Sequence, residues 1–303
     1  MVADGEPLAL SDEPAKAGRQ SRLAASLECG WFTLRRPGFT DVFMSESSSN
    51  RKPRHRGIYL LPNLFTTGAM FAGFYAIVTA IDGHFTEAAM AVVVAAVLDG
   101  MDGRVARMTG TQTEFGVQYD SLSDLLNFGL APSLVLYSWS LSSLKTWGAA
   151  WGKFGWTAAF VYAACAALRL ARFNTQVAVV DKRYFQGLSS TAAAMTTMAY
   201  VWTMDRLGVD RASLAMPTAV ITIVIGLLMV SRLRYYSFKS LPGGEGQSGI
   251  PLLWVIASVL ILVLLAIDPP KVLLGLFALY VLSGPLLTLW GRLALRRRPR
   301  RRG

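Results

Sequence analysis

The sequence predicts an all-α protein, a polytopic bundle of about eight transmembrane helices. Of its 303 residues, 53% are hydrophobic and only 16% are charged, which is a more apolar composition than that of most soluble domains. Eight apolar stretches lie between polar or glycine- and proline-containing breaks, and a membrane span needs roughly 17 to 25 such residues. The stretches are residues 61–81, 85–107, 115–141, 154–177, 189–204, 214–233, 250–267 and 272–293.

Each of these stretches is expected to be a helix. Lipid offers no hydrogen-bond partner to a free backbone amide, so a spanning segment must be a helix or part of a closed barrel. None of the stretches has the alternating pattern of a barrel strand. The fifth is the most polar, because it contains Thr191, Thr196 and Thr197.

The positive residues are distributed unevenly along the chain. A net charge of +11 would by itself also suit a nucleic-acid-binding protein. Twenty lysines and arginines near the predicted spans fall on one side of the membrane, and five fall on the other, namely Lys145, Lys153, Arg206, Arg211 and Lys271. This bias places both termini in the cytoplasm. It also favours membrane lipids, and not nucleic acid, as the partner of the positive charge.

Composition divides the chain into four parts. Residues 1–57 form a polar, basic segment that we expect to be disordered, and residues 58–235 hold the first six predicted spans. Residues 236–293 add two further spans, and residues 294–303 form a basic cytoplasmic tail. Met44 precedes a serine-rich, basic stretch, so either Met1 or Met44 is a candidate for the natural start.

Four aspartates break the apolar pattern of the second and third spans. Asp99 and Asp102 are three residues apart, and Asp120 and Asp124 are four apart, so each pair shares one face of its helix. A short turn around Gly110 would make the two helices antiparallel neighbours and bring the four carboxylates together. Carboxylates at membrane depth are costly and normally face a polar cavity.

Four converging carboxylates would repel one another unless cations neutralise them. Oxygen ligands of this kind suit Mg²⁺ or Mn²⁺, with substrate phosphates completing the coordination. Gly103 and Gly116 leave room for a bulky ligand near the aspartates, and Arg107 can offer several donors to a phosphate. The alternative is that these residues are solvated helix ends with an ordinary basic flank.

The spacing of these residues resembles a known signature. Asp99-x-x-Asp102-Gly103-x-x-Ala106-Arg107 followed by Gly116-x-x-x-Asp120-x-x-x-Asp124 matches the signature of the CDP-alcohol phosphatidyltransferase family at every position. The resemblance implies a transferase whose core is the first six helices. It implies metal ligation by the aspartates, with Asp124 also acting as the general base. It further implies a cytidine diphosphate pocket lined by Gly103, Ala106, Arg107 and Gly116.

Other segments resemble the family members that use serine as the acceptor. They are residues 61–66, 114–116, 120–132, 168–174 and 185–188. One departure is that Ser189 and Thr191 replace two prolines usual in those members. The resemblance implies CDP-diacylglycerol and serine as substrates, a place in the bacterial inner membrane with the active site facing the cytoplasm, and a homodimer as the candidate assembly. Glycerol 3-phosphate, inositol phosphate and choline remain alternative acceptors.

Two further residue pairs have more than one interpretation. Asn63 and Thr66 lie one turn apart and could reach the nucleotide, although Asn63 could instead cap the first helix. Arg169 and Arg172 are similarly spaced at the end of the fourth span. They could bind the lipid phosphate or the serine carboxylate through bidentate contacts, or anchor the helix at the headgroups.

An ion-coupled transporter is the alternative from a different class, because acidic residues within a membrane also mark ion paths. A transporter would be expected to carry acidic residues near the bilayer midplane and broken helices in both halves of the chain. The aspartates here gather near one membrane face, and the second half of the chain has no matching set. The sequence therefore favours the enzyme.

Overall fold

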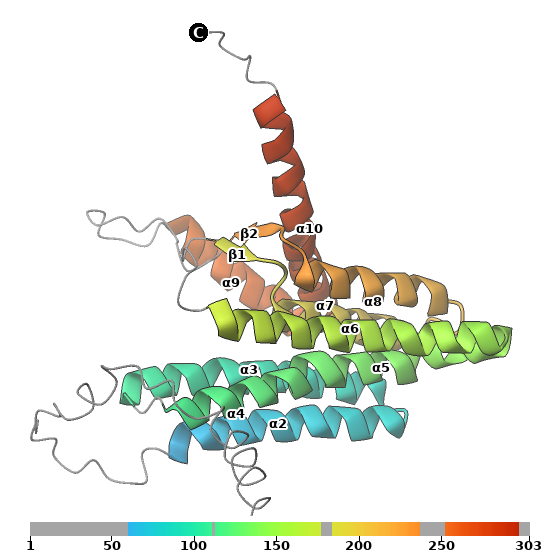
Figure 1. Cartoon of the computed structure of the whole chain (residues 1–303), viewed down its shortest axis with the longest axis horizontal. Coiled ribbons are helices and arrows are strands. Elements are labelled where there is room, and N and C mark those ends of the chain that lie inside the picture. Colours follow the sequence, from blue (N-terminus) through green and yellow to red (C-terminus); the bar gives the residue numbers. More distant parts are fainter. Residues whose placement is uncertain (1–59, 111–112, 177–183, 237–251, 297–303) are drawn as a thin grey trace, which may run out of the picture. The chain divides into compact units, whose positions relative to one another are not determined.

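The computed structural model describes residues 60–110, 113–176, 184–236 and 252–296. The predicted disordered segment 1–57, both candidate starts and the end of the basic tail lie outside the described residues. The described part is almost entirely helical, as predicted (Figure 1). Its α-helices are α2 (Leu60–Ile81), α3 (Phe85–Thr109), α4 (Glu114–Asp124), α5 (Ala131–Trp139), α6 (Ala149–Gln176), α7 (Ser190–Arg206), α8 (Ala215–Val230), α9 (Leu252–Ile267) and α10 (Pro269–Arg296).

All eight predicted stretches are helical, but two of them differ in detail. The third contains α4, a π-helix η2 (Leu125–Leu130) and α5, and it is followed by a 3-10 helix η3 (Leu141–Trp147). The fourth begins at Ala149, five residues before the predicted start, because the helix continues through the polar residue Lys153. Hydrophobicity marks the part of a helix that suits lipid, and the backbone helix can extend beyond it.

A small β-sheet was not predicted. Strands β1 (Tyr184–Gln186) and β2 (Arg234–Tyr236) pair antiparallel, with Phe185 opposite Tyr235. Strands of three residues are too short to show an alternating pattern in the sequence. The sheet links the segment that precedes α7 to the segment that follows α8.

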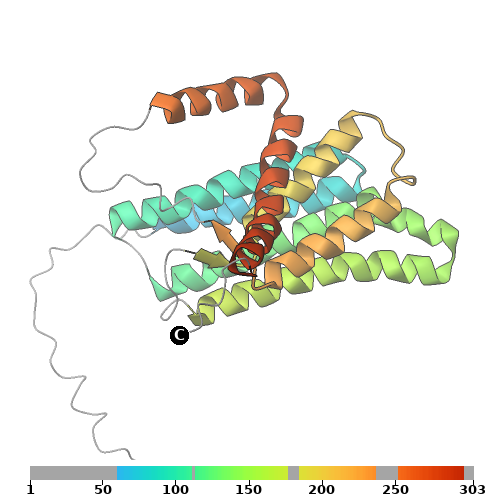
Figure 2. The ribbon, with the colours of Figure 1, turned by 90° about the horizontal axis from the view of Figure 1, so that it is seen from above.

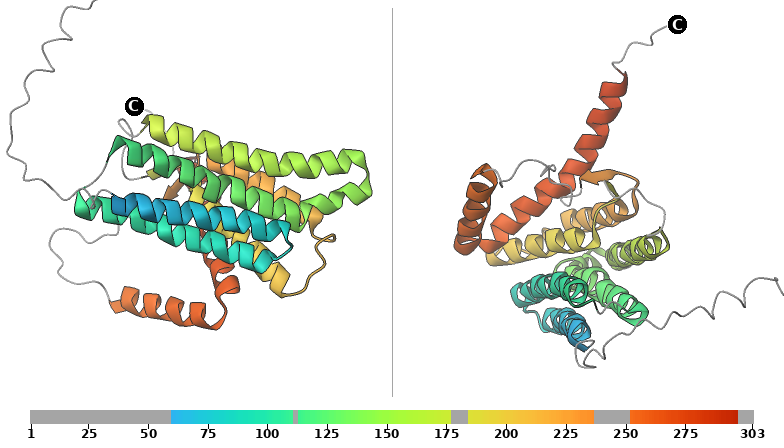
Figure 3. Two further views of the ribbon diagram at one scale, coloured as in Figure 1. Left: turned by 90° about the horizontal axis from the view of Figure 1, so that it is seen from below. Right: turned by 90° about the vertical axis from the view of Figure 1, so that its left-hand side faces the viewer.

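Small side chains allow the first two helices to pack closely. α2 packs along α3, and buried alanines lie on both helices, including Ala76 and Ala80 on α2 and Ala88, Ala89 and Ala95 on α3. Alanine at an interface lets two helix backbones approach closely, which strengthens van der Waals contact. Figure 3, in its right-hand view, shows several helices of the bundle nearly end-on.

The π-helix η2 is explained by the proline that follows it. Pro132 has no backbone N–H and cannot donate to the carbonyl of Phe128, four residues earlier. The backbone widens so that the N–H of Ala131 bonds to the carbonyl of Leu126, five residues earlier. The hydroxyl of Tyr162, on α6, donates to the Phe128 carbonyl at 3.3 Å. A π-helix of this kind often marks a functional region, and this one begins directly after Asp124.

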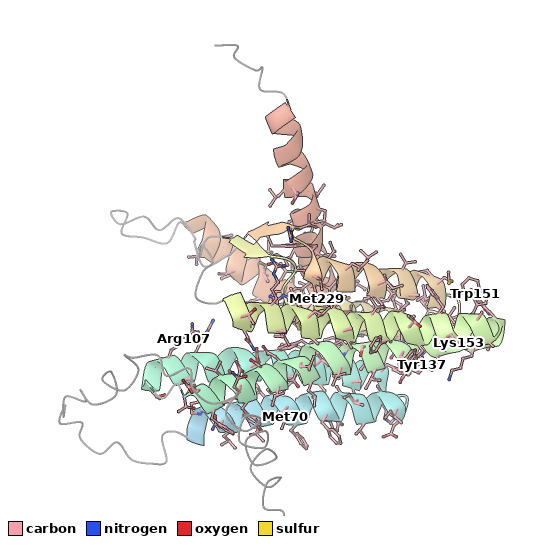
Figure 4. All side chains as sticks on the ribbon, viewed as in Figure 1. Met70, Arg107, Tyr137, Trp151, Lys153 and Met229 are labelled. Carbon is pink, nitrogen blue, oxygen red and sulfur yellow. The ribbon has the colours of Figure 1, made fainter. Side chains whose placement is uncertain are left out.

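Three of the described helices are long and apolar enough to cross a membrane. They contain residues Pro62–Ile81, Ala149–Thr175 and Pro269–Thr288, and the shorter apolar helices are Ala215–Val230 and Val255–Ile267. In Figure 4, Arg107 lies at one end of the helices, and Tyr137, Trp151 and Lys153 lie at the other. Aromatic and basic side chains at helix ends are typical of the membrane interface.

The last two helices are arranged differently from the others. α10 packs against α7 and β2 and crosses the direction of α2–α6 steeply (Figure 1). α9 packs on α10 and otherwise stands apart from the helices of the bundle (Figures 2 and 3). A simple row of parallel spans would have left α10 alongside α2–α6. Its actual course brings it to the end of the bundle that carries β1 and β2.

Candidate metal and substrate site

Three of the four predicted aspartates meet in one cluster. Asp99 comes from α3, and Asp120 and Asp124 come from α4. Each offers a carboxylate oxygen, and these oxygens all lie within 4.8 Å of one another. All three residues are half-buried, and one oxygen each of Asp120 and Asp124 is buried without a hydrogen-bond partner among the described residues.

The cluster has the properties that a divalent cation requires. Carboxylate oxygens are the preferred ligands of Mg²⁺ and Mn²⁺. A buried oxygen without a donor is costly, and a cation would remove that cost as well as the repulsion among the carboxylates. The donor set of Asp99, Asp120 and Asp124 therefore fits the metal that the sequence predicted.

Asp102 lies beside this cluster but is held differently. Its side chain is only 3% exposed, and its Oδ2 accepts a hydrogen bond of 2.8 Å from the hydroxyl of Thr66 on α2. Asp102 interacts electrostatically with Asp99 and Asp120. One oxygen of Asp102 is thus engaged in a hydrogen bond within the protein. Asp102 adds negative charge next to the cluster.

Thr66 belongs to a chain of hydrogen bonds that joins α2 to the third predicted span. The hydroxyl of Ser123 donates to the Thr66 carbonyl at 3.3 Å, and the Asn127 amide donates to the Ser123 hydroxyl at 3.1 Å. Both Ser123 and Asn127 are fully buried. The sequence analysis did not identify them, although a buried amide within an apolar span is a signal that could have found Asn127.

Gly73 allows this contact between the helices. A Cβ atom at Gly73 would overlap the side chains of Asn127 and Leu126. Since the Asn127 side chain is held by Ser123, it is not free to move aside. α2 therefore lies close enough to η2 for Ser123 to reach the backbone of Thr66.

The predicted pairing of the two aspartate-bearing helices holds only in part. α3 packs mainly against α2 and α7, whereas α4 packs against α2 and η2. α2 is therefore the shared neighbour of both helices. The carboxylates of Asp99, Asp120 and Asp124 nevertheless come within 4.8 Å of one another. Gly110 ends α3 in the left-handed conformation, with φ of 60°, which is favourable for glycine.

The start of α4 places Gly116 next to α2. The side chain of Thr113 caps α4 by accepting from the Gly116 N–H at 3.0 Å. A Cβ atom at Gly116 would lie 3.6 Å from Oδ1 of Asn63, so the two predicted nucleotide-binding residues face each other. Asn63 lies within α2, and so it is not the N-cap of that helix.

The other predicted nucleotide-binding residues lie on an open face of α3. Gly103 is exposed, and a Cβ atom there would meet nothing within 4 Å. Ala106 is partly buried. The Nε of Arg107 donates to the Gly103 carbonyl at 2.9 Å, and the side chain is exposed (Figure 4). This face has room for a ligand beside the carboxylates.

Arg169 and Arg172 differ in their surroundings. Arg169 interacts electrostatically with Asp124 and donates to the Ser190 hydroxyl at 2.9 Å. Its Nε is buried without a hydrogen-bond partner among the described residues. Arg172 lies one turn further along α6 and is partly buried. Arg169 thus interacts with one member of the aspartate cluster.

A cavity of about 270 Å³ lies between α4, η2 and α6. Its lining is mostly apolar, and the Asn174 amide spans it by donating to the Ser121 hydroxyl at 3.1 Å. Ser121 follows Asp120 directly in the sequence. The lining residues are Gln118, Ser121, Leu122, Leu125, Ala167, Leu170, Ala171 and Asn174.

A comparison with models of protein families identifies the family of this chain. The family described as CDP-alcohol phosphatidyltransferase matches residues 59–259, which cover the aspartate cluster and α2–α8. The chain belongs to the CDP-alcohol phosphatidyltransferase family. This result confirms the resemblance that the aspartate, glycine and arginine pattern indicated.

Curated relatives within this family include serine-specific enzymes. The chain is 36% identical over 182 residues to the CDP-diacylglycerol–serine O-phosphatidyltransferase of Helicobacter pylori, which covers 60% of this chain and 74% of the relative. It is 41% identical over 155 residues to the enzyme of the same name from Mycobacterium tuberculosis, covering 48% and 51%. It is 31% identical over 180 residues to the archaetidylserine synthase of Methanothermobacter thermautotrophicus, covering 58% and 69%.

Replacing Thr66 with valine is predicted to weaken metal binding. Valine has nearly the same shape but cannot donate to Asp102, so a carboxylate beside the cluster loses its support. Residues that orient a ligand shell typically change metal affinity by about 10- to 100-fold. The measurement is the Mn²⁺ or Mg²⁺ concentration that gives half-maximal activity.

Thr67→Val is the matched control, because the Thr67 hydroxyl bonds to the Asn63 carbonyl and to Tyr119 rather than to an aspartate. Thr66→Ser keeps the hydroxyl and should show the same metal dependence as the wild type. Equal metal dependence in Thr66→Val and wild type would show that the hydrogen bond to Asp102 does not support the site.

Proposed function

We propose that this chain transfers the phosphatidyl group of CDP-diacylglycerol to L-serine, yielding phosphatidylserine and CMP. The observation that carries the proposal is the convergence of Asp99, Asp120 and Asp124 within a family that acts on CDP-activated alcohols. The names of the similar bacterial enzymes favour serine as the acceptor.

In the proposed reaction, Asp124 is the general base. It accepts the proton of the serine hydroxyl, the serine oxygen forms a bond to the phosphorus that bears diacylglycerol, and the bond from that phosphorus to the CMP oxygen breaks. CMP leaves with the electron pair of that bond. A hydroxyl is a weak nucleophile until its proton is removed, and general-base catalysis of this kind contributes roughly 10²- to 10⁴-fold.

Asp99, Asp102, Asp120 and Asp124 are the proposed residues for holding Mg²⁺ or Mn²⁺. The bound metal would neutralise the charge that develops on the phosphoryl oxygens and on the leaving group. Asn63, Thr66, Gly103, Ala106, Arg107 and Gly116 are the proposed contacts of the CDP-lipid. Thr66 also supports Asp102 through its hydrogen bond to that carboxylate.

The proposed catalytic core is residues 58–235, with residues 236–293 as an addition. We further propose that the helices cross the membrane about eight times, in a bacterial inner membrane. The charge bias favours a cytoplasmic active site. An ion-coupled transporter is less well supported, because Asp205 and Asp268, in the second half of the chain, are engaged by Arg211 and by Lys271 and Arg206 respectively.

Purified protein with CDP-diacylglycerol and Mn²⁺ is predicted to release CMP only when serine is added. Parallel reactions with glycerol 3-phosphate, inositol phosphate and choline provide the comparison. Phosphatidylserine is the expected lipid product. Turnover with one of the other acceptors and none with serine would contradict the assignment within the family, and no CMP release with any acceptor would contradict the enzyme class.

Asp124→Asn is predicted to lower kcat by roughly 10²- to 10⁴-fold, because the amide cannot accept the hydroxyl proton. Binding of the CDP-lipid should be reduced much less. Asp99→Asn should instead weaken the metal-dependent binding of CDP-diacylglycerol. Turnover and a binding titration with metal, measured for both variants, separate the two roles. A near-normal rate for Asp124→Asn would exclude it as the base.

The orientation of the chain is predicted from the same charge bias. Single cysteines at Gly110 and Gly148, in a background without Cys29 and Cys165, should differ in their reaction with a membrane-impermeant maleimide. The position at Gly148 should react in intact cells, and the position at Gly110 only after the membrane is opened. The reverse pattern would overturn the proposed orientation.

A further inference from the structure

A cavity of about 340 Å³ lies at the end of the bundle opposite Arg107. Figure 4 shows two of its lining residues, Tyr137 and Lys153, at that end. Tyr137 belongs to α5, Lys145 to η3 and Lys153 to α6, so three successive elements of the chain form the wall. The volume is within the range of small-ligand sites. None of the residues proposed to bind the metal or the nucleotide lines this cavity, and so it is separate from the aspartate cluster.

Three glycines let η3 fold back onto the start of α6. Gly148 joins the two elements with φ of 124°, a conformation that favours glycine. A Cβ atom at Gly155 would overlap the carbonyl of Leu141. A Cβ atom at Gly152 would lie only 2.9 Å from Cγ of Lys145. The stem of Lys145 therefore rests on the backbone of α6, which limits the directions in which its ammonium group can point.

The charge of this cavity is positive. Two lysines and no acidic residue are among the described residues that line it. The Lys145 ammonium lies 5.5 Å from the centroid of the Tyr137 ring, a cation–π contact that positions the ammonium and leaves its charge in place. Among the residues that the structure describes, no carboxylate forms an ion pair with Lys145 or Lys153. Both positive charges are thus available to an anion.

Exposed tryptophans place the cavity at the level of the lipid headgroups. Trp156 lines the cavity and is 59% exposed. Trp147 and Trp151, which adjoin lining residues in the sequence, are 52% and 42% exposed, and their rings pack edge to face with 5.9 Å between centroids. Exposed indole rings gathered at the ends of membrane helices are typical of the membrane–water interface. The anions that are concentrated at that level are lipid phosphates.

We propose that this cavity binds the phosphate of an anionic phospholipid headgroup, with Lys145 and Lys153 as its two cationic contacts. Hydrogen bonds between an ammonium and a phosphate are charge-assisted and therefore strong. A zwitterionic headgroup carries a cation of its own beside the phosphate, and that cation competes with the lysines. A headgroup with only negative charge has no such competitor. The inference goes beyond the proposed transfer reaction and does not depend on it.

The test is photo-crosslinking of the full-length protein, solubilised in detergent, to phosphatidylglycerol that carries a photoreactive group next to its headgroup. Mass spectrometry of the peptides should place the crosslinks in residues 137–156. Lys145→Met and Lys153→Met each keep an unbranched side chain and remove one charge. At lipid concentrations below saturation, each should lower the crosslinking yield about fivefold, and the double variant about 25-fold, because one basic residue near a charged lipid contributes roughly that much.

Lys271→Met is the matched control. It removes the same charge from a lysine outside the cavity, whose Nζ lies 2.7 Å from a carboxylate oxygen of Asp268, and it should leave the yield unchanged. Lys145→Arg combined with Lys153→Arg keeps both charges and should retain the crosslinks. Photoreactive phosphatidylcholine should label these residues much less than phosphatidylglycerol does. Excess inorganic phosphate, added at constant ionic strength, should not compete.

Three results would overturn the inference. The first is equal labelling of the wild type and the Lys→Met double variant, which would show that the lysines do not hold the lipid. The second is equal labelling by phosphatidylcholine, which would show that the cavity does not select anionic headgroups. The third is loss of the crosslinks in excess inorganic phosphate, which would assign the cavity to a free anion instead of a lipid.

Discussion

Repulsion among the carboxylates of Asp99, Asp120 and Asp124 is the constraint on which the surrounding structure depends. Like charges within 4.8 Å in a half-buried site raise the free energy of the folded chain unless a proton or a cation neutralises them. Two helices can bring such groups together only if other contacts hold the helices firmly. The protein meets this requirement by packing both helices on a third.

That third helix is α2, which supports the site without contributing a carboxylate. Thr66 donates to Asp102 and its carbonyl accepts from Ser123, so one residue connects α3, α2 and α4. Gly73 allows η2 to approach α2 closely. The π-helix, required by Pro132, begins immediately after Asp124. Support of this kind fixes the geometry of ligands that would otherwise move apart.

Elements that follow the aspartates hold Arg169. Ser190 of α7 accepts a hydrogen bond from Arg169, and backbone hydrogen bonds from Gly187 and Leu188 hold the start of α7 near the end of α8. The residues proposed to bind the metal and the nucleotide come from α2, α3 and α4, whereas Arg169 and Ser190 come from α6 and α7.

The sequence by itself determined the helical class, the eight apolar segments and the identity of Asp99, Asp102, Asp120 and Asp124, because hydrophobic runs and helical spacing are local properties. It did not determine which carboxylates converge, since that depends on how α3 and α4 pack on α2. The short β-sheet and the course of α10 were also decided by tertiary structure. Each is fixed by contacts between residues far apart in the chain, such as Tyr235 with Tyr280. Contacts of this kind leave no local pattern in the sequence from which they could be predicted.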